Sequence, residues 1–424
     1  MPHTDSIGKL LDLKDSNIIF KEDFYSERII KQIVHKVITA KLTYQPKACY
    51  NCGHIFDHQI IKHGFYKSTI KLLSTAGYPT LLDLSKQRYL CNHCDSTFAL
   101  KTDLVKTNCF IASKTKIAIA IDAQDKISEK DLAKRHNVSH STVSRIIDTA
   151  YEAYKVKRNF LPKNLNFDEF KSVKEASGAM SFLFVNADTG EIVDIVENRK
   201  LYYLKNYFLG FTKAARRAVK NIVIDMYAPY MTLIKALFPN ANIIIDKFHL
   251  VQLYSRALNK TRIRIMNQNQ ENYSKLKRFW KLLLKDREKL DCVKLRYNHS
   301  FKKQMREVDI VEFLLDQSPE LKASYKLYQN VKTAIKLKDM KLLESSIDEV
   351  DELVSDYLLT SIKTTKKYRD FIENMFISGY TNGVIEGINN KIKVIKRIAF
   401  GYRSFVHFKN RILITQGKLK LKTA

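Results

Sequence analysis

The chain has 424 residues, with 73 Lys and Arg against 44 Asp and Glu, so its formal net charge is +29. At roughly 150 residues per domain the length suggests two or three domains, and a hydrophobic content of 45% excludes wholesale disorder. No apolar stretch reaches the ~18 residues of a transmembrane helix, and the N-terminus lacks the pattern of a secretory signal. A protein this basic typically binds a polyanion, and composition alone leaves DNA, RNA and an acidic membrane open.

The first 45 residues contain two stretches with helical periodicity, around Ile7–Leu13 and around Ser26–Ile38. Apolar residues that recur every three or four positions predict helices with one buried face. We therefore expect residues 1–45 to form a helical N-terminal arm.

Four of the six cysteines form two Cys-x-x-Cys pairs, and residues 67–73 and 79–84 between the pairs alternate as strands of a hairpin would. Two such pairs complete a four-sulfur zinc site. Two disulfides or a redox dithiol are the alternatives, and the absence of a secretory signal disfavours disulfides. The pattern predicts a zinc ribbon over residues 46–110 that binds one structural Zn²⁺ through Cys49, Cys52, Cys91 and Cys94. Nearby histidines are possible substitutes for a ligand, and we interpret Cys109 and Cys292 as small buried hydrophobes.

Residues 111–160 have the pattern of a helix-turn-helix. A helix is expected over 114–126, Ser128 is a plausible N-cap for a second helix, and Asn137–Ser139 make a tight turn into a third. Short polar side chains on that third helix are suited to contact bases or phosphates. An ordinary helical hairpin is the alternative interpretation. The candidate contacts are Ser139, His140, Ser141, Thr142, Ser144 and Arg145.

Residues 161–250 change to a mixed pattern. Strands are expected at 165–170, 180–185, 192–196, 221–226 and 242–246, with helices over 200–219 and 228–237. This order predicts an antiparallel meander followed by two crossover units. Residues 251–375 are rich in Lys, Leu and Glu with few strand signals, which predicts a helical domain, and a last helix begins near Asn382.

Three carboxylates occupy positions suited to chemistry. Asp168 and Asp225 end predicted strands, where α/β sheets open into a ligand crevice. The third, Glu386, lies on a helix whose polar face carries Asn390, Lys393 and Arg397 within about 40° of it. Such a stripe offers a carboxylate for a metal and cations for a phosphate backbone, and the alternative is a solvated amphipathic helix with chance charges.

At these motifs the chain resembles DDE transposases of the bacterial insertion-sequence family called ISL-three. The resemblance covers nearly the whole chain, and its C-terminal motif is the most specific. The matching runs are Asp168-Glu-Phe170, Asp225-Met-Tyr-Ala-Pro-Tyr230, Phe238-Pro-Asn-Ala-Asn-Ile-Ile-Ile-Asp-Lys-Phe-His249, Thr381-Asn-Gly-Val-Ile-Glu-Gly-Ile-Asn-Asn-Lys-Ile-Lys393 and Lys396-Arg-Ile-Ala-Phe-Gly-Tyr402.

The resemblance implies a multidomain α+β protein. After the ribbon and the helix-turn-helix, an RNase H-like α/β core over 161–250 is interrupted by an all-α insertion over 251–375 and resumes at 376–424 with its last helix and a basic tail. It implies that Asp168, Asp225 and Glu386 are catalytic and bind two Mg²⁺ or Mn²⁺ ions. Asp246 and His249 match an accessory signature, although Asp246 also ends a strand and competes with Asp225 for the metal. The strand order of this fold favours Asp225.

The expected function is that of a transposase that binds the terminal inverted repeats of its element and catalyses metal-dependent DNA cleavage and strand transfer. Its partners would be double-stranded DNA, both the element's ends and the target, and further copies of the chain in a homodimer or larger assembly, with no membrane. We expect it at the nucleoid in a bacterial cytoplasm. The alternative is a catalytically silent DNA-binding regulator derived from a transposase.

Overall fold

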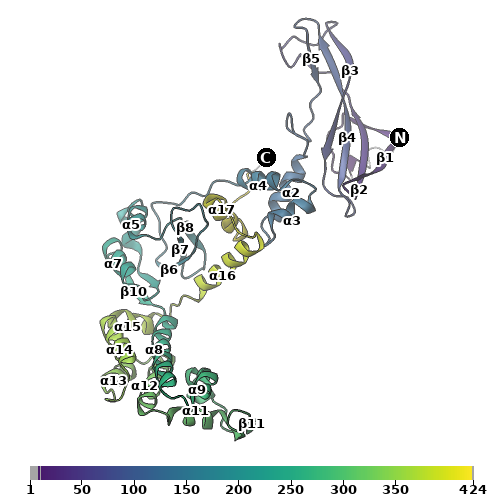
Figure 1. Ribbon diagram of the computed structural model, residues 1–424. Helices are drawn as coiled ribbons and strands as arrows, with labels where there is room; N and C mark the ends of the chain where they lie inside the picture. Colours follow the sequence, from purple (N-terminus) through teal and green to yellow (C-terminus); the bar gives the residue numbers. More distant parts are fainter. Residues whose placement is uncertain (1–7, 10, 423–424) are drawn as a thin grey trace. The chain divides into compact units, whose positions relative to one another are not determined.

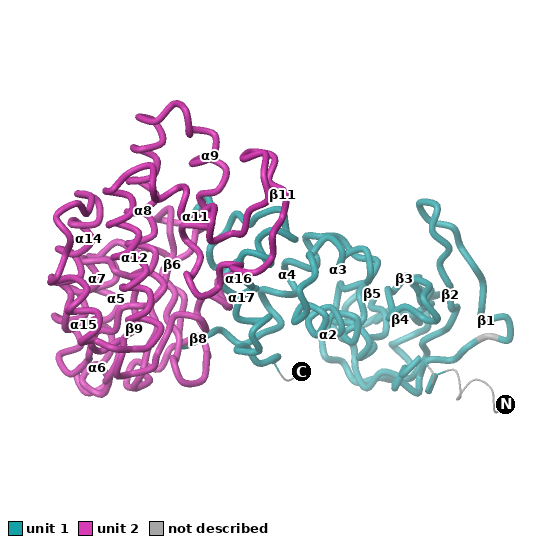
Figure 2. The backbone as a smooth tube through the Cα atoms, turned by 90° about the horizontal axis from the view of Figure 1, so that it is seen from below, with its two compact units in different colours: residues 1–155, 173–175, 391–424 teal, residues 156–172, 176–390 magenta. Residues whose placement is uncertain are grey.

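The computed structural model describes residues 8–9 and 11–422, which form two compact units. One unit comprises residues 1–155, 173–175 and 391–424, and the other comprises residues 156–172 and 176–390 (Figure 2). Among the described residues, no helix combines the length and the apolar character needed to cross a membrane.

The first unit begins with a five-stranded sheet (Figure 1). The strand order is β1-β2-β4-β3, with β5 paired to β4; β2 and β4 are parallel, and the other neighbours are antiparallel. The hairpin expected between the cysteine pairs and the strand expected after the second pair are both confirmed. The strands are β1 (Ile18–Ile30), β2 (Ile33–Leu42), β3 (Ile60–Lys71), β4 (Thr80–Cys91) and β5 (Ser96–Ala99).

The helix expected around Ser26–Ile38 is wrong, because these residues lie in β1 and β2. The two strands are joined by a two-residue turn in which Lys31 and Gln32 have φ values of 50° and 64°. Positive φ at both central residues defines a type I′ hairpin turn, which normally takes Asn and Gly. Of the other expected helix, Ile7–Leu13, residues 7 and 10 lie outside the described residues; Gly8 and Lys9 are helical, and Leu11 with Asp12 forms a turn.

The second unit contains the mixed sheet that the sequence predicts, in the order β10-β9-β6-β7-β8. The strands β6, β9 and β10 are parallel, and β6, β7 and β8 form an antiparallel meander. The single helix expected over 200–219 is instead two helices separated by a short break. Thr212 follows the break and caps the second helix, because its side chain accepts from the Ala215 N–H. The elements are β6 (Asn164–Lys171), β7 (Met180–Asn186), β8 (Ile192–Val196), α5 (Leu201–Leu209), α6 (Lys213–Ala218), β9 (Asn221–Ile224), α7 (Ala228–Leu237) and β10 (Asn242–Ile245).

Between β10 and the last helix of this unit lies the long helical segment. Its first helix starts directly after β10, and Tyr254 and Leu258 on it share one continuous core with Ile224 and Ile245 of the sheet. The expectation of an all-α insertion is wrong at one place, where a short hairpin pairs β11 with β12. The elements are α8 (Lys247–Gln268), α9 (Tyr273–Arg278), α10 (Trp280–Leu284), η1 (Arg287–Lys289), β11 (Arg296–Asn298), β12 (Lys303–Met305), α11 (Glu307–Leu315), α12 (Pro319–Leu337), α13 (Met340–Asp348), α14 (Asp356–Lys367), α15 (Arg369–Ser378) and α16 (Gly383–Ile398).

Four helices form a small module in the first unit: α2 (Ser113–Asp122), α3 (Glu129–Arg135), α4 (His140–Ala150) and α17 (Phe405–Thr415). The cap expected at Ser128 is present, since its side chain accepts from the Asp131 N–H, and Ser139 caps α4 by accepting from the Thr142 N–H. Asn137 has φ 50° in the turn between α3 and α4. The module's core contains Ile119, Leu132, Val143, Ile147 and, from the far end of the chain, Ile414.

The C-terminal segment is therefore not the loose basic tail of the second unit that the sequence suggested. Arg411 on α17 is fully buried and donates to the carbonyls of Ala123 and Ile127. These two hydrogen bonds hold the loop between α2 and α3. His407 lies 2.6 Å from both Glu129 and Asp148 and so ties α17 to α3 and α4. Sequence reasoning missed this because only tertiary contacts reveal that the helix belongs to the module.

Replacing Ile414 with Ala should open the four-helix module, because the side chain is 1% exposed in its core. We expect a loss of about 2–5 kcal/mol in local opening free energy, measured as faster amide hydrogen exchange in peptides from α2, α3 and α4. Val406→Ala on the same helix is the matched control, since Val406 is 65% exposed. Unchanged exchange in Ile414→Ala would show that α17 is not part of this core.

Candidate catalytic site and zinc cluster

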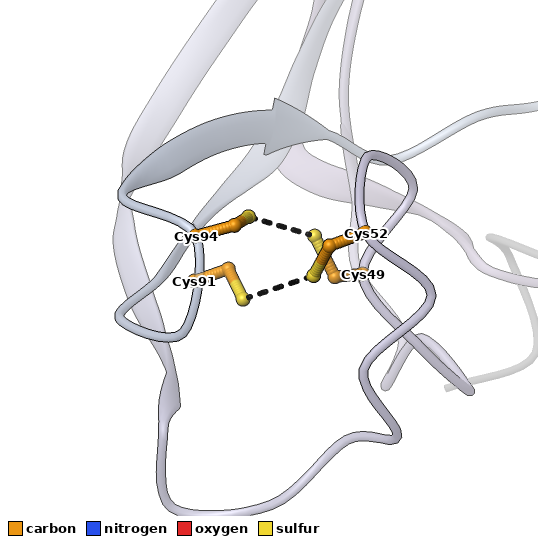
Figure 3. Close-up of side chains that lie close together, drawn as sticks. All are labelled: Cys49, Cys52, Cys91 and Cys94. Carbon is orange, nitrogen blue, oxygen red and sulfur yellow. Dashed lines mark hydrogen bonds between the residues drawn. The ribbon is translucent and has the colours of Figure 1, made fainter.

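The four paired cysteines meet at one point beside β4 and β5 (Figure 3). Their sulfur atoms all lie within 4.8 Å of one another, and Cys49–Cys94 and Cys52–Cys91 are both 3.8 Å apart. Four sulfurs at ~2.3 Å from a zinc ion in a tetrahedron are about 3.8 Å apart, whereas a disulfide needs ~2.05 Å. The sulfur cage therefore fits Zn²⁺ and is not a pair of disulfides.

The surroundings of Cys94 favour its thiolate form. A 2.9 Å contact with the Ser96 hydroxyl lowers the pKa of the Cys94 thiol to about 6. His54 and His93 stack on each other with ring centroids 4.7 Å apart and are not members of the cluster. The four sulfurs are a complete set of ligands for a structural zinc site, which leaves no open position for a reacting water.

Two of the predicted carboxylates lie on neighbouring strands of the second unit. β6 and β9 are parallel, with Asn166 opposite Val223, so Asp168 two residues on is beside Asp225 just past the end of β9. Asp168 accepts hydrogen bonds from the Glu169 N–H (2.7 Å) and from the Asn389 side-chain amide (2.6 Å). Burial, with the negative charge of Asp225 adding to it, raises the pKa of Asp168 to about 6.

Asp225 is held by one imidazole and one amide. His249 Nε2 lies 2.8 Å from Asp225 Oδ1, and the same oxygen accepts from the Asn382 side-chain amide at 3.0 Å. The hydrogen bond to Asp225 raises the pKa of His249, which favours an imidazolium that offsets the carboxylate charge. The imidazole of His249, an expected accessory residue, thus contacts the Asp225 carboxylate, while its backbone N–H donates to the Asp246 carbonyl at 3.1 Å.

Asp246 has a different environment. Its side chain is buried; Oδ1 accepts from the Asn382 N–H and Oδ2 accepts from the Phe248 N–H, both at 3.1 Å. The second bond makes it the N-cap of α8. With both oxygens engaged by backbone donors, Asp246 fixes the chain at the start of α8 and just before α16.

Glu386 is exposed in the first turn of α16. Among the described residues, the four cysteines are the one group of three or more metal-ligating side chains close enough to hold an ion. The structure therefore does not bring Glu386 into one ligand set with Asp168 and Asp225. The helix that carries it does reach both aspartates, because Asn382 contacts Asp225 and Asn389 contacts Asp168.

Sequence reasoning missed three asparagines of this site, all inside or beside the motifs it singled out. Asn166, Asn382 and Asn389 are buried, and Asn166 donates to the Thr381 carbonyl at 2.8 Å. Asn389 lies on α16 and Asn382 lies immediately before its first residue, so the start of this helix presents both amides to the two aspartates. The sequence does show that Asn382 and Asn389 border the apolar stripe of the helix that carries Glu386. It does not show which carboxylates their side-chain amides contact.

The predicted DNA contacts are mostly exposed. On α4, His140, Ser141 and Arg145 are exposed and Thr142 is half-buried, while Ser144 points toward His407 at 3.4 Å. On α16, the polar stripe expected from the sequence is confirmed as exposed, and the opposite stripe is buried. The exposed residues are Glu386, Asn390, Lys393 and Arg397, and the buried ones are Ile385, Ile388, Ile392 and Ile395.

Comparison with known families matches two segments of this chain. A model described as transposase, of the ISL3 (ISL-three) DDE type, matches residues 165–412, and a model described as the zinc-finger of transposases IS204, IS1001, IS1096 and IS1165 matches residues 45–94. The first covers more than half of the chain and both aspartates of the site. The chain therefore belongs to the ISL3 family of transposases.

Two curated relatives were found. The chain is 26% identical over 211 residues to the transposase for insertion sequence element IS1001 of Bordetella parapertussis, covering 48% of each protein. It is 41% identical over 113 residues to a protein of Lactococcus lactis subsp. lactis named ATP-dependent protease, covering 27% of this chain and 36% of that protein. The chain thus spans less than half the length of either relative.

Cys52→Ser should abolish stable zinc binding, because it removes one of four ligands from a closed site. We expect about one zinc per chain in the parent protein and none in the variant after dialysis against a weak chelator, measured by elemental analysis. Cys292→Ser is the control, since Cys292 is exposed and outside the cluster. Retention of stoichiometric zinc by Cys52→Ser would contradict the four-sulfur assignment.

When Mg²⁺ is absent, Asp168→Asn should stabilise the second unit relative to the parent, and this stabilisation should be greater at pH 8 than at pH 4. The carboxyl ionises near pH 3.9 in an unfolded chain but near 6 when folded, so stability falls as pH rises through this window and the loss is complete above about 6. The amide carries no such penalty.

The measurement is the unfolding free energy reported by Trp280 fluorescence in Mg²⁺-free buffer. At each pH, the unfolding free energy of the parent is subtracted from that of Asp168→Asn. This difference should be larger at pH 8 than at pH 4, by on the order of 1–3 kcal/mol. Asp370→Asn, at a side chain 88% exposed, is the control and should show no difference. A gain independent of pH would argue against a raised pKa at Asp168.

Proposed function

We propose that this chain is a DDE transposase that binds the terminal inverted repeats of its insertion sequence and catalyses cleavage and strand transfer at those ends. Membership of the ISL3 family supports the general reaction. The observation that carries the proposal at residue level is a pair of contacts made by α16 and the residue just before it: Asn389 on the helix donates to Asp168, and Asn382 donates to Asp225. The strand order β10-β9-β6-β7-β8 agrees with an RNase H-like core.

The donor set suits a hard divalent cation. Carboxylate oxygens are the ligands that Mg²⁺ and Mn²⁺ prefer, and two carboxylates side by side, one with a pKa raised to about 6, gain from a cation between them. Two such ions, when bound by Asp168, Asp225 and Glu386, would activate the attacking oxygen and stabilise the leaving 3′ oxygen. Glu386 would join this set by its side chain turning toward the sheet from the same helix that the two amides hold in place.

The protein's own groups position the reaction. Asn389 and the Glu169 N–H fix the orientation of Asp168, and His249 with Asn382 fixes Asp225. Water would attack the phosphodiester at the element's end and release a 3′-OH, which would then attack target DNA. No covalent enzyme intermediate is needed, so no Ser or Tyr nucleophile is required.

Recognition of the ends would fall to the first unit. The zinc ribbon and a helix-turn-helix formed by α3 and α4 would read the terminal repeats, with His140, Ser141, Thr142 and Arg145 facing the DNA. Lys393 and Arg397 on α16 would contact phosphates without sequence preference. Synapsis of two ends implies a homodimer or larger assembly on DNA.

Asp168→Asn, Asp225→Asn and Glu386→Gln should each abolish Mg²⁺-dependent nicking and joining of DNA that carries the element's ends, while binding to those ends remains. The physical reason is the loss of one anionic ligand without loss of the fold. Nicking is measured on denaturing gels and binding by mobility shift, with Glu352→Gln on the exposed surface as the control. Full strand transfer by Glu386→Gln would remove Glu386 from the catalytic set, and end binding without cleavage by the parent would favour a silent regulator.

A further inference from the structure

A basic cleft of about 820 Å³ lies within the second unit, lined by residues of α8, η1, α12 and α15 and by the segment that leads into α16. Its walls belong partly to the helical insertion and partly to elements next to the sheet. Neither the ribbon nor the helix pair nor the polar stripe of α16 contributes to it. Six cations line it: Lys247, Arg287, Lys289, Lys332, Lys336 and Lys338.

The charge of this cleft is only partly neutralised. Its two acids are Asp286 and Glu288, so the lining carries a net charge of +4. Lys332 and Lys289 pair with Asp286, and Lys336 pairs with Glu288 at 2.6 Å. The remaining three cations, Lys247, Arg287 and Lys338, are exposed and have no acidic partner among the described residues. Unpaired cations in a cleft focus a field that attracts an anionic ligand.

One end of the cleft is lined by residues that adjoin the contacts of Asp225. Lys247 directly follows Asp246, and Thr381, which also lines the cleft, directly precedes Asn382, whose side chain donates to Asp225. A nucleic acid with one phosphate at Asp225 would therefore have neighbouring phosphates at the mouth of this cleft.

The other walls suit bases and exclude a duplex. Val251, Met375, Phe376 and Tyr380 contribute apolar and aromatic surface beside the cations. Cations that follow a backbone combined with aromatic faces are the usual construction of a single-strand site. A cavity of this volume is of the size that takes a small ligand, so it accepts a few nucleotides and not a double helix.

We propose that this cleft binds a single DNA strand that continues from the scissile phosphate, so that the insertion holds the strand on one side of the cut. This inference rests on the proposed function for the position of the scissile phosphate. The cations that decide it are Arg287 and Lys338, whose side chains pair with no carboxylate among the described residues, and Lys247, which follows Asp246.

The test compares the full-length parent with the double variant Arg287→Gln/Lys338→Asn, in which Asn is chosen because residue 338 has φ 57° and Asn tolerates that conformation. The matched control is Lys326→Gln/Lys341→Gln, which removes the same charge from exposed lysines outside the cleft. Three probes are used in zinc-replete, Mg²⁺-free buffer: a 12-nucleotide single strand, an element end that is blunt, and the same end with a single-stranded flank.

We expect the double variant to bind the single strand and the flanked end at least tenfold more weakly than the parent and the control, with a salt slope smaller by about 2. Binding to the blunt end should not change. A photoreactive nucleotide in the single strand should cross-link to peptides of residues 247–251 or 375–381 in the parent. Equal losses on all three probes, or no loss on any, would overturn the proposal.

The single-strand arm separates this proposal from the proposed function. If the parent neither binds nor cuts the element's ends but cross-links the single strand in the cleft, the transposase assignment fails and the cleft stands. If the ends are cut normally and the double variant binds and cross-links the single strand as the parent does, the cleft inference is wrong and the proposed function stands.

Discussion

The second unit is organised around the need to hold two like charges side by side. Parallel pairing of β6 with β9 puts Asp168 next to Asp225, and partial burial of both makes that arrangement unfavourable on its own. Four neighbouring donors offset it, because Asn389, Asn382, His249 and the Glu169 N–H all donate to one carboxylate or the other. These donors orient the carboxylates as well as stabilise them, which a bound cation then requires.

This constraint explains how a long insertion can separate parts of one site. Asp246 ends the sheet portion and caps α8, and its second oxygen accepts from the Asn382 N–H more than a hundred residues later. Asn166 on β6 adds a bond to the Thr381 carbonyl. The segment that leads out of the insertion is thus fastened both to Asp246, just past β10, and to Asn166 on β6, which fixes the place where α16 begins.

Much of the second unit could be predicted from sequence because its strands are short apolar runs with acids at their ends, a pattern that burial alone enforces. The elements and contacts that were missed depend on features that neighbouring residues in the sequence do not reveal. Lys31 and Gln32 form a hairpin turn without Gly or Asn, so β1 and β2 were mistaken for a helix. Asn382 and Asn389 have ordinary neighbours in sequence, and their partners come from strands more than a hundred residues away.

The net charge of +29 illustrates the same limit. The ten cations that follow Glu386 with no acid among them suggest a phosphate-binding tail, yet Arg411, one of the ten, is fully buried and holds two backbone carbonyls. A cation that caps carbonyls or pairs with a carboxylate contributes little field to a ligand. The cations that matter for a polyanion are exposed and have no acidic partner among the described residues, as is the case for Lys247, Arg287 and Lys338. The cleft that they line also includes Thr381, which precedes Asn382. Location relative to the aspartates, and not total charge, therefore decides which basic residues can act on DNA.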